Sequence, residues 1–359
     1  MKKLKVGVIG AGAIAQMAHL PFYQNHPNVD LVALVDLNVD RAREIASKYN
    51  VKNIYSSAKE MFEHEVLDAV SICTTNNTHV PLAKLALQHG VNVLVEKPLA
   101  TCLKEALELE DLASKINKVC MIGMTHRFRN DTNAIKKIID SGTLGEIYYG
   151  KARLLQRRNT PLGWFTDKSK SGGGPLMDIG VHVLDLAWWL SGQPEVKSVS
   201  GHLVKGIGNY ATIMQDRWES AETTLSHTPF DVEDFASAFI RFKSGFVLQL
   251  EVSWAMNGHP DEGIKVDLFG TKGGISLQPL YLYSEQNQIL SDTKLNVVPN
   301  NPYEAEINHF VHVVQYDQKP LIDIHQGINV MEMLEGISLS SMHQKEILIE
   351  DLMAAKKSI

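Results

Sequence analysis

Five short apolar runs, each followed by a stretch of helical character, constrain the fold of this chain more than any other feature. They are rich in β-branched residues and lie at residues 5–10, 31–36, 68–73, 91–96 and 118–123. Their residues are apolar without regular alternation, as expected for strands that are covered on both faces. Strands of this kind separated by helices predict a parallel sheet between two layers of helices. We therefore expect a doubly wound α/β domain over residues 1–125.

The pattern changes after about residue 125, where longer segments alternate between apolar and polar residues. Residues 146–158 form one such segment, and residues 234–255 are interpreted as two strands around a turn at residues 243–245. Helices are expected over residues 303–316 and 327–342, and a last strand over residues 346–350. The chain of 359 residues is long for one hydrophobic core. We predict a second domain over residues 126–359, of the α+β class, with a large, open and mostly antiparallel sheet.

Composition narrows the possible partners and compartments. The formal net charge is −6 and there is no long basic block, which argues against nucleic acid or an anionic membrane as a partner. No run of about 18 apolar residues is present, so no membrane-spanning helix is expected. The cysteines, Cys73, Cys102 and Cys120, lack CxxC spacing and fit a reducing cytosol. The first residues imitate a signal peptide, but their glycines favour a strand and turn, so we expect a cytoplasmic protein.

The sequence G-A-G-A-I-A, which begins at Gly10, follows the first predicted strand and opens a helix. Gly10 permits a tight turn, and Gly12 lets the backbone approach a pyrophosphate at the helix N-terminus. Asp36 ends the second strand, where a carboxylate can accept the ribose hydroxyls of a dinucleotide. This combination predicts a Rossmann domain that binds NAD, and NADP is less favoured because Asp36 would repel a 2′-phosphate. Arg41 is interpreted as part of a solvated helix face.

The segment SGGGPLMDIGVHVLDLAWWL, residues 171–190, places three ionisable side chains in apolar surroundings. Asp178, His182 and Asp185 are spaced i, i+4 and i+7, so a helix would present them in one stripe. Burying such groups is costly unless they are paired, and the pattern fits either a core polar network or a functional site.

Lys97, in the sequence E-K-P-L, follows the fifth predicted strand. The carboxyl ends of the strands of an open α/β sheet face the ligand crevice, so Lys97 is aimed at the cofactor; the alternative is an ordinary surface lysine. A cis Lys97–Pro98 peptide is one way to direct the side chain into the crevice, and we predict that bond.

Five motifs, GVIGAGAIA, CTTNNTH, EKPLA, GMTHRF and GGGPLMDIGVHVLD, stand in the order and spacing of one known family. They resemble the glucose–fructose oxidoreductase and inositol dehydrogenase family (Gfo/Idh/MocA). The sequence GINVMEMLEGISLSS near the C-terminus is similar to the family's closing helix, so the resemblance covers nearly the whole chain. It implies a Rossmann domain, a substrate domain, and an open sheet that leaves one face for a subunit partner in a homodimer or homotetramer. Thr75 departs from the pattern, because many relatives have proline there.

The resemblance implies that Lys97, Asp178 and His182 surround the reacting carbinol. Neutral His182 then suits the role of base for the hydroxyl proton, and Lys97 that of stabilising the developing alkoxide. Asp178 would orient the substrate hydroxyls or the Lys97–His182 pair, and Asp185 is expected to be a structural partner. The expected cofactor contacts are Gly10, Gly12, Ala13, Ile14, Asp36, Thr74, Thr75, Asn76, His79, Glu96 and Lys97.

Several polar residues near these motifs allow two interpretations. Arg127, Arg157 and Trp164 are candidate substrate contacts, since an aromatic face suits the C–H faces of a sugar. Arg127 has the alternative role of bracing the domain crossover. For Arg157 and Arg158 the alternative is surface charge, and for Trp164 it is packing.

Glu306, His309 and His312 are spaced i, i+3 and i+6, which imitates a metal site. On an amphipathic helix this spacing is more typical of solvated polar surface, and we expect no catalytic metal.

The chain is therefore predicted to be an NAD-dependent dehydrogenase that transfers hydride between a secondary alcohol of a sugar, polyol or sugar derivative and the nicotinamide. Two alternatives use the same fold: a redox-neutral NAD-dependent glycosidase, and a non-catalytic sensor of NAD or sugar. Net NADH production separates the dehydrogenase from the glycosidase. The presence of both Lys97 and His182 argues against the sensor.

Overall fold

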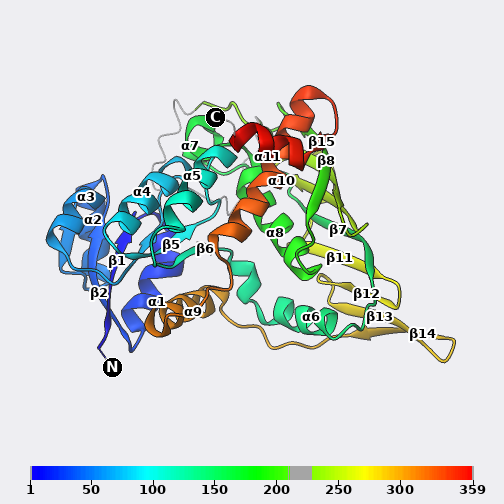
Figure 1. Cartoon of the computed structure of the whole chain (residues 1–359), viewed down its shortest axis with the longest axis horizontal. Helices are drawn as coiled ribbons and strands as arrows, with labels where there is room; N and C mark the ends of the chain where they lie inside the picture. The colour runs from blue at the N-terminus through cyan, green and yellow to red at the C-terminus, as the bar shows by residue number, and fades with distance from the viewer. Residues whose placement is uncertain (1, 209, 211–228, 358–359) are drawn as a thin grey trace.

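Two separate β-sheets organise the chain, one of six strands and one of nine (Figure 1). The computed structural model describes residues 2–208, 210 and 229–357. The six-stranded sheet lies in the N-terminal part of the chain, and the nine-stranded sheet lies beyond the helices that separate the two. The predicted α/β class and the division into a parallel and a mostly antiparallel sheet are confirmed.

The first sheet is entirely parallel, with the strand order β3-β2-β1-β4-β5-β6. Its strands are β1 (Leu4–Ile9), β2 (Val29–Val35), β3 (Asn53–Tyr55), β4 (Ala69–Ile72), β5 (Asn92–Glu96) and β6 (Cys120–Gly123). This is the dinucleotide-binding order, whose ligand crevice lies where the order reverses, between β1 and β4. The short edge strand β3 was not predicted, because its three residues carry no continuous apolar run.

Helices cover this sheet, and two of them begin at a residue whose side chain caps them. They are η1 (Ala15–His19, a π-helical turn), α1 (Leu20–Asn25), α2 (Val39–Lys48), α3 (Ala58–His64), α4 (Asn76–Gln88) and α5 (Leu103–Ala113). The side chains of Asn38 and Ser57 accept backbone N–H groups at the starts of α2 and α3, as N-caps do. Pro21 is the second residue of α1, where its missing N–H costs no helical hydrogen bond.

The second sheet has the order β14-β13-β12-β11-β7-β10-β9-β8-β15 and is antiparallel except between β7 and β10. Its strands are β7 (Ile147–Leu155), β8 (Val196–Val204), β9 (Phe235–Phe242), β10 (Val247–Ser253), β11 (Lys265–Gly270), β12 (Gly273–Ser276), β13 (Tyr281–Gln286), β14 (Ile289–Lys294) and β15 (Ile347–Leu348). The predicted hairpin around residues 243–245 joins β9 to β10.

One face of the second sheet is buried and the other is open. The alternating residues Ala238, Ile240, Leu248 and Leu250 are buried on the face that carries the helices. In Figure 1 the helices α8 and α10 lie on the side of this sheet that faces the N-terminal domain. No helix of the described chain covers the opposite face in that view.

The remaining helices follow the crossover from the first sheet. They are η2 (Thr125–Phe128), α6 (Asn130–Asp140), η3 (Trp164–Thr166), α7 (Lys168–Ser171), η4 (Leu176–Gly180, a π-helical turn), α8 (Val181–Leu190), α9 (Pro302–Tyr316), α10 (Ile324–His343) and α11 (Ile349–Lys357). Two expectations need correction. The segment 171–190 is a turn, a π-helical turn and an α-helix rather than one rod, and the strand expected at 346–350 pairs only through β15 before the chain turns into α11.

The helix α9 returns to the N-terminal sheet, where it packs beside α1 (Figure 1). Just after it, the backbone N–H of Ile122 in β6 donates to the carbonyl oxygen of Ile322. Segments distant in sequence therefore share one core. Among the residues that the structure describes, none of the helices combines the length and hydropathy that a membrane span requires.

Candidate active site

The glycine-rich turn after β1 has the geometry of a phosphate-binding loop. Gly10 has φ +95°, and a side chain there would collide with the carbonyl oxygen of Cys73. No atom lies within 4 Å of the position that a Cβ of Gly12 would occupy, so a ligand can approach the backbone directly. Ala13 and Ile14 are partly exposed at the start of the helix. The turn therefore fits a dinucleotide pyrophosphate, as the sequence predicted.

Asp36 lies at the end of β2 and is held by several donors. Its carboxylate accepts the backbone N–H groups of Ala11 and Asn38, each at 2.8 Å. The guanidinium of Arg41 also donates to both carboxylate oxygens, with Nε 3.1 Å from Oδ2 and Nη2 2.6 Å from Oδ1. The interpretation of Arg41 as a solvated surface residue is therefore wrong. It pairs with the acid that the sequence assigned to the ribose.

Lys97 is directed from the end of β5 toward the second domain. The predicted cis Lys97–Pro98 bond is confirmed. The ammonium Nζ donates to the backbone oxygen of Asp178 at 2.8 Å and to its carboxylate Oδ1 at 3.1 Å. The other carboxylate oxygen of Asp178 accepts the indole N–H of Trp254 at 3.0 Å. Both carboxylate oxygens of Asp178 thus accept a hydrogen bond, one from Lys97 and one from Trp254.

Trp254 was not identified from the sequence. It follows β10 and is only 1% exposed, among Phe165 and Val232. Seventy-six positions separate it from Asp178. The sequence carries a buried tryptophan after an alternating strand, but no signal that names its hydrogen-bond acceptor.

Two of the three glycines before η4, Gly172 and Gly174, lie close to the backbone of other segments. A side chain at Gly174 would collide with the backbone oxygen of Glu233. The carboxylate of Glu233, itself buried, accepts the backbone N–H of Leu176 at 3.1 Å. A carboxylate at this end of a helix also interacts favourably with the helix dipole. Glu233 thus fixes the start of the turn that carries Asp178.

His182 lies one turn further along, at the start of α8, and contacts a second histidine. Its ring meets that of His126 edge to face, with centroids 4.9 Å apart. The Nδ1 atoms of both rings are buried and have no hydrogen-bond partner among the described residues. Burial, with the charge of Lys97 and the neighbouring His126, holds the pKa of His182 well below 6.5. Burial and the charge of Arg129 lower the pKa of His126 to about 4.

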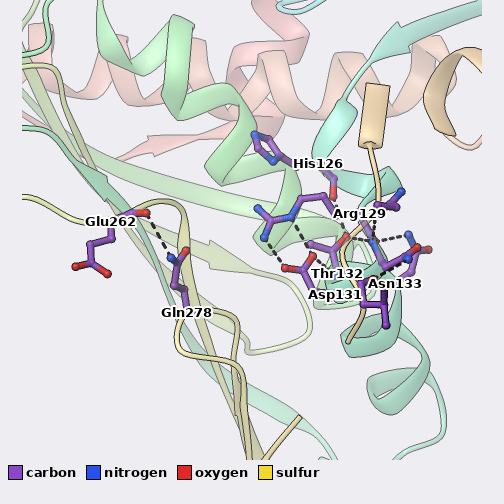
Figure 2. A network of polar contacts seen from close by, with 10 residues as sticks. His126, Arg129, Asp131, Thr132, Asn133, Glu262 and Gln278 are labelled. Carbon is purple, nitrogen blue, oxygen red and sulfur yellow. Dashed lines mark hydrogen bonds and ion pairs between the residues drawn. The ribbon is translucent and has the colours of Figure 1, made fainter. Parts of the chain in front are cut away.

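The two histidines line a cavity of about 940 Å³. The other polar residues around it are Arg129, Gln156, Asp261, Glu262 and Gln278, and its apolar lining includes Leu154, Ile179 and Ile264. Figure 2 shows His126 and Arg129 on one side and Glu262 with Gln278 on the other. His126 was part of a sequence motif assigned to the crossover, and its place in the cavity was not foreseen.

The third residue of the predicted stripe, Asp185, is a structural partner. It forms a two-pronged ion pair with Arg127, with Nε 2.9 Å from Oδ2 and Nη2 2.6 Å from Oδ1. Arg127 is fully buried and also lies against the rings of Trp188 and Trp189. A side chain without exposure cannot touch a substrate in this conformation, which favours the bracing role over substrate contact.

The predicted cofactor residues after β4 bond mainly to one another and to the second domain. The hydroxyl of Thr74 accepts from Thr78, and that of Thr75 donates to Asn77. Asn76 is buried, and its amide donates to the carbonyl oxygen of Ser171 at 2.8 Å. This last bond ties the start of α4 to the end of α7.

Two further predicted cofactor residues, His79 and Glu96, are buried beneath the crevice. His79 Nδ1 lies 2.8 Å from the carbonyl oxygen of Pro98, and burial lowers the pKa of its ring. Glu96 lies 2.8 Å from Nε2 of His19. Burial alone would raise the pKa of Glu96, but the hydrogen bond and charge of His19 hold it below its ordinary value. Both residues support the loop of Lys97 from below.

Arg157 and Trp164 lie away from the cavity lining. Arg157 is exposed, and Trp164 stacks on Phe165 with centroids 4.1 Å apart. Arg158 donates to the carbonyl oxygens of Arg157 and Met256. These contacts agree with the surface and packing alternatives.

Glu306 contradicts the expectation of a solvated helix face. It is 1% exposed, and its Oε2 accepts the hydroxyl of Thr125 at 2.8 Å, whereas Oε1 has no partner in the described chain. Burial and the charge of Glu96 raise its pKa well above 4.5. His309 is partly buried and His312 is exposed. Within the described ranges, no group of three or more His, Cys, Asp or Glu residues is placed to hold a metal ion.

Comparison with known proteins gives matches over most of the chain. A family described as "Oxidoreductase family, NAD-binding Rossmann fold" matches residues 4–124. The "GFO/IDH/MocA C-terminal domain" matches residues 132–276. Together these matches cover all of the first sheet and strands β7 to β12 of the second.

Several similar proteins are sugar or polyol dehydrogenases by name. A D-glucoside 3-dehydrogenase of Escherichia coli is 33% identical over 342 residues, which are 94% of this chain and 95% of that protein. A scyllo-inositol 2-dehydrogenase (NAD(+)) of Bacillus subtilis is 25% identical, covering 91% of each chain. A solved levoglucosan dehydrogenase in complex with NADH and levoglucosan has a TM-score of 0.82 and 24% identity, over 97% of this chain and 100% of that one. The last similarity shows the fold alone.

Proposed function

Because the chain belongs to the Gfo/Idh/MocA family of oxidoreductases, we propose that it oxidises a secondary alcohol of a sugar, polyol or sugar derivative with NAD⁺. The chain is a dehydrogenase with an NAD-binding Rossmann domain, and its named relatives are dehydrogenases.

One observation carries the proposal: Lys97 from the first domain is bonded to Asp178 of the second, beside a cavity that His182 lines. The side chains of Lys97 and Asp178 are each 18% exposed, so a substrate can reach this ion pair although most of its surface is buried. An ammonium in such a place stabilises an alkoxide more strongly than it would in bulk water.

His182 is the proposed base. Its lowered pKa keeps the ring neutral at neutral pH, so it can accept a proton. The Nδ1 atom of His182 is buried and has no hydrogen-bond partner among the described residues. We therefore assign the other ring nitrogen, Nε2, as the one that meets the substrate in the cavity. The hydroxyl proton of the substrate passes to this nitrogen, and Lys97 holds the oxygen it leaves. Asp178 keeps Lys97 in place.

The cofactor is assigned to the turn at Gly10 and Gly12 and to Asp36, whose geometry fits it. When bound, NAD⁺ supplies the hydride acceptor. We propose NAD over NADP, because the carboxylate of Asp36 stands where a 2′-phosphate would lie. Arg41 already pairs with Asp36 and partly offsets that repulsion.

We also propose that the boundary between the two domains lies at residues 125 and 126.

We further propose that the chain forms an oligomer through the open face of the second sheet. That face carries aromatic side chains beside charged ones. The side chain of Phe239 is 38% exposed, and the guanidinium of Arg241 lies over its ring. The ring of Tyr149 stacks on that of Phe269 with centroids 5.7 Å apart. Exposed aromatic and arginine side chains are enriched at subunit interfaces.

The experiment is an assay of NADH absorbance with purified protein, NAD⁺ and a panel of glucose, methyl glucosides, levoglucosan and inositols. The proposal expects net NADH with at least one of them. Absence of NADH from the whole panel, with no oxidation of NADH by the matching ketoses, contradicts it. Consumption of a glycoside without net NADH would favour the redox-neutral glycosidase.

A further inference from the structure

The cavity beside His182 is larger than one sugar ring requires. Its volume of about 940 Å³ is near the upper end of the roughly 300–1,000 Å³ typical of pockets that enclose drug-sized ligands. Its lining comes from the crossover and the second domain and shares no residue with the predicted cofactor contacts. The space is therefore additional to the dinucleotide crevice.

We propose that this cavity holds a second unit of a neutral glycoside, in a subsite between Arg129 on one wall and Glu262 with Gln278 on the other. The proposal rests on the dehydrogenase function proposed above, because it places the oxidised ring beside His182 and the second ring further along the same cavity.

The first wall is rigid because side chains bind its backbone (Figure 2). The hydroxyl of Thr132 donates to the carbonyl oxygen of His126 at 2.8 Å. The amide of Asn133 donates to the carbonyl oxygens of Arg127 and Arg129, at 2.8 and 2.7 Å. Arg129 in turn pairs with Asp131, with Nε 2.9 Å from Oδ1. The guanidinium is thus oriented and its charge is largely offset before any ligand arrives.

The second wall is a loop fixed to neighbouring strands. The amide Nε2 of Gln278 donates to the backbone oxygen of Glu262 at 3.3 Å, the contact drawn in Figure 2. The carboxylate of Asp261, which precedes Glu262 in this loop, accepts the backbone N–H of Leu155 at 3.1 Å. It also forms ion pairs with Arg153 and Lys265. The loop is therefore held against the end of β7, where Gln156 also lines the cavity.

The chemistry of these walls suits hydroxyl groups rather than an anion. Arg129 and Asp261 both have partners of opposite charge, whereas the carboxylate of Glu262 is exposed. An exposed carboxylate accepts hydroxyl hydrogen bonds and repels phosphates and uronic acids. The amides of Gln156 and Gln278 offer donors and acceptors, and Leu154, Ile179 and Ile264 offer apolar surface to the C–H faces of a ring.

The test compares substrates by the ratio of their kcat/KM values in NADH formation. Glucose, methyl glucosides and the disaccharides maltose, cellobiose and trehalose are assayed with the wild type and two variants. At least one disaccharide should exceed glucose by tenfold or more. Gln278→Ala should lower that ratio about threefold to tenfold, the size of one neutral hydrogen bond. Gln286→Ala, at an exposed position of β13, is the matched control and should leave the ratio unchanged.

A second comparison tests whether the negative charge of Glu262 disfavours an anionic ligand. A disaccharide that carries a carboxylate should be a poorer substrate than its neutral counterpart, and Glu262→Gln should narrow the difference. Melting temperatures of all variants show whether they are folded. If NADH forms equally well from glucose and every disaccharide, or if Gln278→Ala leaves the ratio unchanged, the subsite is refuted while the dehydrogenase function stands. If no sugar yields NADH, the proposed function itself fails.

Discussion

The indole N–H of Trp254 offers the sharpest structural test of how Asp178 and Lys97 are held. Trp254→Phe removes the donor to Asp178 Oδ2 and keeps an aromatic ring in the same buried place. A hydrogen bond to a charged group contributes about 1.5–3 kcal/mol. If that energy orients Lys97 for the reaction, kcat/KM should fall by about 10-fold to 150-fold, at about 1.4 kcal/mol per factor of ten.

A second readout separates orientation from simple loss of packing. Without the indole donor, Asp178 keeps only the partners on its other oxygen and holds Lys97 less firmly, so turnover should fall while NADH affinity changes little. The matched control is Trp188→Phe, which removes another buried indole N–H, bonded to the carbonyl oxygen of Pro194. The control should lower the melting temperature and leave turnover as it was. A folded Trp254→Phe enzyme with wild-type kcat/KM and wild-type turnover would refute the reasoning.

The lowered pKa of His182 predicts that the acid limb of wild-type kcat/KM lies below pH 6.5; a midpoint at or above 6.5 would count against a buried neutral base. The raised pKa of Glu306 means that the folded protein keeps a proton that the unfolded chain releases above pH 4.5. The stabilisation that Glu306 gives the folded state is therefore lost as the pH rises above 4.5. The melting temperature of Glu306→Gln should therefore rise relative to that of the wild type as the pH increases above 4.5. A melting-temperature difference that does not change with pH would contradict this. The carboxylate of Asp36 should make kcat/KM at least about tenfold higher with NAD⁺ than with NADP⁺. Asp36→Ser should lower this ratio, because it removes the repulsion and leaves Arg41 to attract the 2′-phosphate. Equal kcat/KM values with the two cofactors in the wild type would show that Asp36 is misassigned.

Local patterns in the sequence predicted the parts of the fold that local physics decides. Continuous apolar runs gave the parallel strands, and alternation gave the hairpin of β9 and β10. The turn at Gly10 was predictable because only glycine accepts φ +95° against the Cys73 carbonyl oxygen. The positions of Asp36 and Lys97, each directly after a parallel strand, were predictable because the carboxyl ends of parallel strands share one edge of the sheet.

The contacts that the sequence did not reveal join residues far apart along the chain. Nothing near Trp254 indicates that its indole binds Asp178, and nothing near Glu233 indicates that it holds the N–H of Leu176. Helical periodicity placed Glu306 on a polar face, but it could not show that the first domain covers this face. Arg41 is a different case: its partner Asp36 is only five positions away, but it precedes the helix of Arg41, so helical periodicity does not relate the two. Pairing across elements depends on tertiary packing, which periodicity does not encode.

The role of His182 as the base, acting with Lys97, is tested most directly by His182→Ala, Lys97→Ala and the double variant. For each, turnover, NADH affinity and melting temperature are measured with a sugar that the wild type oxidises. Loss of the base should lower turnover by about 10²- to 10⁴-fold, while NADH affinity changes little. The two losses should not add, because both residues act on one proton transfer. A folded His182→Ala enzyme that binds NADH and keeps most of its turnover would contradict the assignment and return His182 to a structural role.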